Sequence, residues 1–128
     1  MTRVVVDASA LAALVFHEPA GEAIRDRLEG ATVFAPTLLK YELANTAWKK
    51  ARRQPADEAK ILAALTVTLN GAWGIVWQDV EPADVVLVAR AVGLTAYDAA
   101  YLWLAGTLGA DLVTLDARVI DASAMLSA

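Results

Sequence analysis

Four acidic residues lie in strongly apolar parts of the sequence, where charged side chains are uncommon. Asp7 ends the stretch VVVD and Asp116 ends the stretch LVTLD, so each follows a run that is typical of a buried strand. Asp98 lies three residues after Thr95 in LTAYDAAYLWLAG, and Glu42 lies in the helical pattern of PTLLKYELANTAWK. Carboxylates at such positions either satisfy the ends of helices or bind a ligand.

Each acid has a structural explanation when it is considered alone. Asp7 or Asp116 could cap a helix by accepting the backbone N–H groups of its first turn. Thr95 and Asp98 resemble a capping box with Asp in the place of Glu, and Glu42 could be a solvated helix residue. Capping accounts for three acids separately but does not account for the convergence of all four. The set therefore favours a site.

Convergence of these acids would require a cation. Two carboxylates about 4 Å apart repel each other by about 4 kcal/mol at an effective dielectric constant of about 20. The chain has no cysteine and one histidine, so a metal would have oxygen ligands, which favours Mg²⁺ or Mn²⁺, as one or two ions. Such ions polarise a phosphate and activate a water, which predicts metal-assisted hydrolysis of a phosphodiester.

The elements that must position these residues alternate along the chain. Strands are predicted at residues 3–6, 31–34, 75–78 and 111–115. Helices are predicted at 8–16, 20–29, 37–53, from Pro55 to about 69, 82–92 and 98–108, and 117–127 is weakly patterned. This alternation predicts an α/β fold with a mostly parallel sheet covered on both faces, although the strand order stays open. If the first and last strands are neighbours, Asp7 and Asp116 face each other.

Composition restricts the class of protein. The 128 residues predict a single domain, and a hydrophobic fraction of 58 % with a mean hydropathy of +0.46 suits a sheet buried on both faces. The net charge of −4 argues against a globally basic nucleic-acid surface but leaves room for a local one. No apolar run approaches the roughly 20 residues of a spanning helix, and no signal peptide is recognisable, so we expect a cytoplasmic protein.

One basic cluster could contact RNA. It comprises Lys49, Lys50, Arg52 and Arg53, at the far end of the predicted helix that carries Glu42. Such side chains bind phosphates, but cations also suit a helix C-terminus because they complement its dipole. The sequence leaves both interpretations open.

The segments VVVDASALAALVFHEPAGEAI, APTLLKYELANTAWK and LTAYDAAYLWLAGTLGADLVTLDAR together resemble the PIN-domain family, specifically VapC-type toxin ribonucleases of type II toxin–antitoxin systems. The resemblance implies a three-layer α/β/α sandwich over residues 1–128 and endoribonuclease activity that depends on Mg²⁺ or Mn²⁺. It also implies a homodimer and inhibition by a small VapB-type antitoxin. In this family a last short strand follows the final Asp, and VIDASAMLSA fits a strand poorly.

The resemblance also assigns site residues. The catalytic and metal-binding acids of the family match Asp7, Glu42, Asp98 and Asp116, and the hydroxyl residues that support them match Ser9, Thr95 and Thr114. Two alternatives remain. Asp7 could be the phospho-acceptor of a haloacid-dehalogenase-like or receiver-like protein, although Ser9 stands where a dehalogenase has its second acid. The chain could also be a catalytically silent PIN-like binding module, but no acid of the set is missing.

Overall fold

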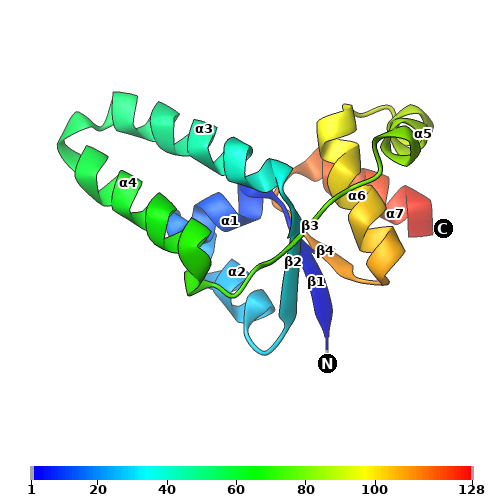
Figure 1. Ribbon diagram of the computed structural model, residues 1–128, viewed down its shortest axis with the longest axis horizontal. Coiled ribbons are helices and arrows are strands. Elements are labelled where there is room, and N and C mark those ends of the chain that lie inside the picture. The colour runs from blue at the N-terminus through cyan, green and yellow to red at the C-terminus, as the bar shows by residue number, and fades with distance from the viewer. Residues whose placement is uncertain (1, 128) are drawn as a thin grey trace.

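The computed structural model describes residues 2–127 and contains one parallel β-sheet between two layers of helices (Figure 1). The strands are β1 (Arg3–Val6), β2 (Thr32–Pro36), β3 (Val76–Gln78) and β4 (Asp111–Val113), in the order β3-β2-β1-β4. All the strand pairs found among the described residues are parallel. Strand β1 is central, and its three valines are at most 3 % exposed because helices cover both of its faces.

The helices divide between the two faces of the sheet. On one side lie α1 (Ala8–Val15), α2 (Gly21–Leu28), α3 (Leu38–Arg53) and α4 (Glu58–Val67), and on the other lie α5 (Pro82–Val92), α6 (Ala96–Leu108) and α7 (Ala117–Ser127) (Figure 1). A short 3₁₀ turn, Pro55–Asp57, joins α3 to α4, and a π-helical turn, Thr68–Ala72, follows α4. The predicted three-layer α/β/α sandwich is confirmed.

The end of the chain differs from the last short strand that the family resemblance implied, and which residues 117–127 fitted poorly. Residues 117–127 form helix α7, whose buried residues Val119 and Ala122 are three apart and pack against Leu102 of α6. Helical spacing of the apolar residues, rather than strand alternation, therefore decides the structure of this segment. Strand β4 is also shorter than predicted, since it ends at Val113 and the next side chain, Thr114, turns to Asp7 instead.

The sheet brings the ends of β1 and β4 together. The register pairs Val6 with Val113, and the backbone N–H of Asp7 extends this pairing by donating to the carbonyl of Val113 at 3.2 Å. Because parallel strands end at the same sheet edge, the residues that follow β1 and β4 meet there. The strand order that the sequence left open therefore makes β1 and β4 neighbours.

Within residues 2–127 no single helix is long and apolar enough to cross a membrane. Helices α5 and α6 together have the length and composition of a span, but they are bent by 104° relative to each other, and much of α6 lies in the core of this domain.

Candidate active site

Asp7 is the most buried acid of the predicted set, with 6 % of its surface exposed. It caps α1, because its Oδ1 accepts the backbone N–H of Ala10 at 3.1 Å. The same oxygen accepts the hydroxyl of Ser9 at 2.7 Å, and Oδ2 accepts the hydroxyl of Thr114. Capping and a place at the sheet edge are therefore compatible for this side chain.

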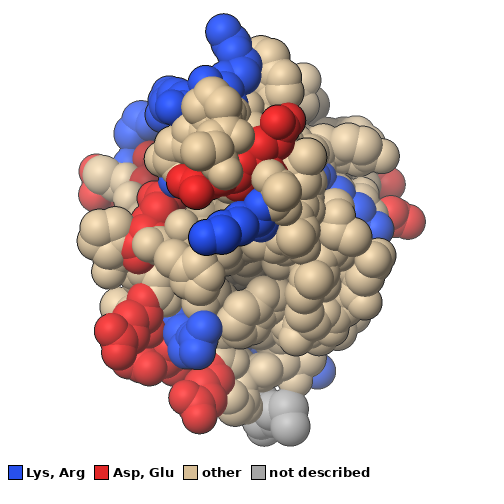
Figure 2. Space-filling view, turned by 90° about the vertical axis from the view of Figure 1, so that its left-hand side faces the viewer, with Lys and Arg blue, Asp and Glu red and all other residues tan. Residues whose placement is uncertain are grey.

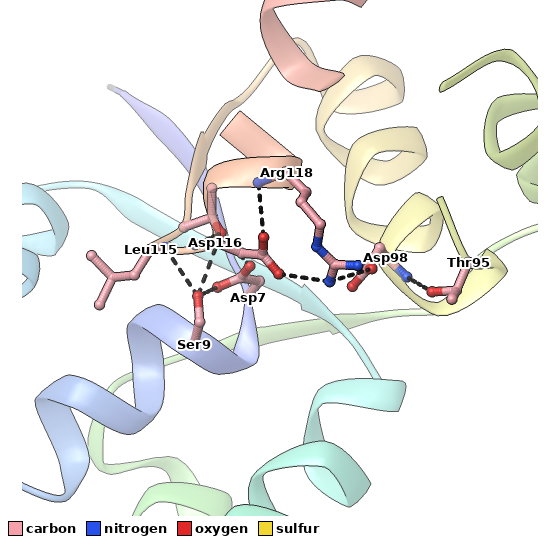
Figure 3. A network of polar contacts seen from close by, with 8 residues as sticks. Asp7, Ser9, Thr95, Asp98, Leu115, Asp116 and Arg118 are labelled. Atoms are coloured by element: carbon pink, nitrogen blue, oxygen red, sulfur yellow. Dashed lines mark hydrogen bonds and ion pairs between the residues drawn. The ribbon is translucent and has the colours of Figure 1, made fainter. Parts of the chain in front are cut away.

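The two hydroxyls connect Asp7 to the backbone that follows β4 (Figure 3). Ser9 Oγ accepts the N–H of Leu115 at 3.0 Å, and Thr114 Oγ1 accepts the N–H of Asp116 at 3.1 Å. Each hydroxyl thus accepts a hydrogen bond from a backbone N–H and donates one to the Asp7 carboxylate. In both chains of hydrogen bonds the dipoles point their positive ends toward the negative charge of Asp7. This arrangement fixes Asp7 to both strands.

Burial still dominates the electrostatics of Asp7. Desolvation raises its pKa above the usual value, the hydrogen bonds from Thr114, Ser9 and Ala10 lower it by less, and the charge of Asp116 raises it further. The hydrogen bonds to Asp7 therefore do not fully offset the cost of burying its negative charge.

Glu42 is held by a residue that the sequence analysis did not single out. It lies on α3 beside the buried Leu39 and Leu43, and its Oε1 accepts a hydrogen bond from the hydroxyl of Tyr101 on α6. Burial raises the pKa of Glu42, the Tyr101 hydrogen bond lowers it by less, and the charges of Asp98 and Asp7 raise it. The pKa of Tyr101 is raised, mainly by burial, so this side chain stays a neutral donor.

Asp98 and Asp116 share a cation. Asp116 begins α7 by accepting the N–H of Arg118 at its Oδ1 (2.9 Å), and its Oδ2 lies 3.1 Å from Arg118 Nη2. The same nitrogen lies 3.7 Å from Asp98 Oδ2, so the guanidinium spans α6 and α7 (Figure 3). The Arg118 side chain holds the pKa of Asp116 below its usual value.

The predicted supporting residues occupy different positions. Ser9 and Thr114 contact the carboxylate of Asp7 directly. Thr95 caps α6 by accepting the N–H of Asp98 at 3.2 Å, and it makes no hydrogen bond to a carboxylate among the described residues. Tyr101 and Arg118 were missed. The signal for Tyr101 was its position in YDAAY, three residues after Asp98 and so on the same side of α6.

The charges of the four acids interact, but the side chains are not arranged as a metal-binding site. The charges that raise the pKa of Asp7 and Glu42 come from the other members of the set. In residues 2–127 no group of three acids, histidines or cysteines is arranged to hold a metal ion. The donor chemistry fits a hard divalent cation, because every side chain offers carboxylate oxygens and the buried negative charge is only partly compensated.

The predicted RNA-binding cluster lies elsewhere. Arg52 lies ten positions after Glu42, a distance of about 15 Å along the axis of α3. Lys50 already pairs with Glu18 at 3.5 Å, and the Arg52 guanidinium lies 4.6 Å from the ring centre of the exposed Trp48. Figure 2 shows basic side chains at the upper edge of this face and others lower down, several of them beside acidic ones. The cluster therefore lies toward the C-terminal end of α3, away from Glu42 along the helix.

Comparison with known proteins agrees with the fold. The PIN domain family model matches residues 4–124. The chain is 35 % identical to Ribonuclease VapC3 of Pyrobaculum aerophilum, over 93 % of each protein. It is 36 % identical to Exonuclease VapC9 of the same organism, over 90 % of this chain and 81 % of that protein. The chain belongs to the PIN domain family.

Two solved structures share its architecture. PAE2754 from Pyrobaculum aerophilum superimposes with a TM-score of 0.75 at 31 % identity, covering 95 % of this chain and 85 % of that one. VapC20 of Mycobacterium tuberculosis, described as a toxin that cleaves the sarcin-ricin loop, gives a TM-score of 0.68 at 13 % identity, covering 93 % and 94 %. The second likeness concerns the fold alone.

Proposed function

We propose that this protein is a metal-dependent endoribonuclease and the toxin of a toxin–antitoxin pair. The observation that carries the proposal is the chain of neighbouring acids around one sheet edge. Arg118 joins Asp98 to Asp116, and Asp98 and Asp7 lie close enough to Glu42 for their charges to raise its pKa. The names of two relatives, a ribonuclease and an exonuclease of the VapC type, support a nuclease. Membership of the PIN domain family argues against the phospho-acceptor alternative.

The four acids would hold Mg²⁺ or Mn²⁺, as one or two ions. When bound, the metal would supply a Lewis acid that polarises the phosphate and lowers the pKa of a water. Ser9 and Thr114 keep the Asp7 carboxylate in one orientation, and Tyr101 does the same for Glu42. Because Tyr101 binds Oε1, Glu42 keeps Oε2 to bind a second ion or to orient the attacking water. The expected products carry 5′-phosphate and 3′-hydroxyl ends.

The direct test is RNA cleavage by the purified protein with Mg²⁺, Mn²⁺ or EDTA. A circular RNA separates an endonuclease from an exonuclease, since it has no ends to digest. We expect cleavage of the circle with either metal, none with EDTA, and at least a 100-fold loss in Asp7→Asn or Asp98→Asn, on the scale that removal of a single catalytic group commonly costs. The matched control is Asp26→Asn, an exposed acid of α2.

The outcomes separate the candidates. Full cleavage by Asp7→Asn or Asp98→Asn would contradict the metal site. Digestion of linear but not circular RNA would favour an exonuclease, the activity named for one relative. Absence of any cleavage, with folded protein and bound metal, would favour the catalytically silent module.

A protein partner follows from the same charge distribution. We infer that a VapB-type antitoxin inhibits the site by inserting a basic side chain among the four acids. We also propose a homodimer, supported by large apolar side chains that stay exposed on α3, α5 and α6, including Tyr41 (75 % exposed), Leu87 (53 %) and Tyr97 (65 %). Light scattering of the free protein tests the dimer. A structure of the complex with all four acids open to solvent would contradict the inhibition.

A further inference from the structure

Arg118 is the cation closest to the candidate site among the described residues, and its surroundings are unusual for an arginine. It lies in the first turn of α7, where the positive end of the helix dipole opposes a positive side chain. Two carboxylates from different elements offset that opposition, at 3.1 Å for Asp116 and 3.7 Å for Asp98. The fold thus places a guanidinium directly between two of the four acids.

The guanidinium is accessible from outside. The Arg118 side chain is 67 % exposed, whereas the side chains of Asp98 and Asp116 are 23 % and 29 % exposed. Both ion pairs use the single nitrogen Nη2, so the other N–H donors of the guanidinium take no part in them. Exposed ion pairs of this kind are weak, and a divalent cation on the same carboxylates would outcompete them.

We propose that Arg118 acts as an internal counter-ion for Asp98 and Asp116. When a divalent cation is bound, the Arg118 side chain moves and its guanidinium binds a phosphate of the RNA instead. This inference rests on the proposed function, since it assigns a substrate-contacting residue to the same site. A guanidinium suits the second role because it can bind two phosphate oxygens at once. Its stem is anchored by α7, so the required movement is a change of side-chain rotamer at the rim of the site.

The counter-ion role is tested with the metal alone. Mn²⁺ binding to the full protein is measured by calorimetry in the absence of RNA, for the wild type, Arg118→Ala and Arg118→Lys. Removing the competing charge should tighten Mn²⁺ binding about tenfold in Arg118→Ala, with Arg118→Lys close to the wild type. The matched control is Arg90→Ala, an exposed arginine of α5, which should leave Mn²⁺ binding unchanged.

The phosphate role is tested by the salt dependence of RNA cleavage at saturating Mn²⁺. Arg118→Ala should raise KM about tenfold and reduce the slope of log kcat/KM against log salt by about one, as expected for the loss of one phosphate contact. Arg118→Lys should restore the slope and only part of the affinity, because an ammonium group lacks the bidentate geometry. A merely structural role for Arg118 would change neither slope nor Mn²⁺ affinity in this pattern.

The results distinguish this inference from the proposed function. Equal Mn²⁺ affinity in the wild type and Arg118→Ala would overturn the counter-ion role, and an unchanged KM and salt slope would overturn the phosphate role. Failure of the wild type and Arg118→Ala alike to bind Mn²⁺ would instead refute the metal-dependent nuclease, and the inference with it.

Discussion

The hydrogen bond between Tyr101 and Glu42 gives a prediction that isolates one interaction of the site. Tyr101→Phe removes only the hydroxyl, since the ring of this residue, 3 % exposed, stays in the same core position between α6 and α3. The carboxylate of Glu42 then loses its donor while the repulsion from Asp98 and Asp7 remains. We expect a loss of stability that depends on the charge of Glu42.

The magnitude follows from the type of hydrogen bond. Bonds to charged groups contribute roughly 1.5–3 kcal/mol, and Glu42 is only partly buried, so water can replace part of the lost bond. We expect Tyr101→Phe to lower the free energy of unfolding by about 1.5 kcal/mol, or Tm by about 6 °C, at pH 8. Because the Tyr101 bond lowers the pKa of Glu42, its contribution is present above that pKa and is lost as the pH falls through it.

Urea unfolding of the metal-free protein at a series of pH values measures this effect. In a Glu42→Gln background the same substitution should cost only about 0.5–1 kcal/mol, the value for a neutral bond, at every pH. Tyr41→Phe is the matched control, because that tyrosine is 75 % exposed on α3, and it should change stability by less than about 0.5 kcal/mol. Equal losses in the two backgrounds, or a loss that does not decline between pH 8 and pH 4, would refute the reasoning.

Three further predictions concern the same region and its support. Thr114→Val should cost about 1–3 kcal/mol in urea unfolding, because it leaves Asp7 Oδ2 without its donor in a buried position, and no loss would show that water replaces the hydroxyl. Without metal, stability should rise as the pH falls from 7 toward the raised pKa values of Asp7 and Glu42, since protonation removes partly uncompensated charge. Saturating Mn²⁺ should reverse that trend, and a metal-free protein that weakens steadily on acidification would argue against it. Gly21→Ala should cost about 1–3 kcal/mol, because the new Cβ would lie 2.4 Å from the carbonyl oxygen of Ala13, and an unchanged Tm would mean that α1 and α2 can separate freely.

The sequence predicted the fold well where apolar periodicity was strong. The valines of β1 and the pattern of Leu39 and Leu43 on α3 have the burial expected from their spacing. Helix α7 was missed because only Val119 and Ala122 mark its buried face, and that sparse spacing gives little periodic signal without knowledge of the helix it packs against. Strand order likewise depends on long-range packing, to which local periodicity is insensitive.

The candidate site was predictable in its acids and less so in the residues that hold them. Asp7 and Asp116 follow buried strands, a position that pattern alone reveals. Arg118 and Tyr101 act across elements, and their partners on other helices are set by the docking of α3, α6 and α7. A residue whose role is to contact a distant side chain carries no local signature, so its discovery required the tertiary structure.

The hydrogen bond from Thr114 to Asp7 joins residues 107 positions apart, almost the full length of the chain. During synthesis the β1 strand and α1 leave the ribosome long before Thr114 and Leu115, which complete the hydrogen bonds around Asp7. Helices α1 to α4 can pack early, whereas the edge formed by β1 and β4 has to wait until β4 has been made. For a protein proposed to cut RNA in the cell that produces it, the nascent chain on the ribosome therefore lacks a finished site until Thr114 and Leu115 have been made.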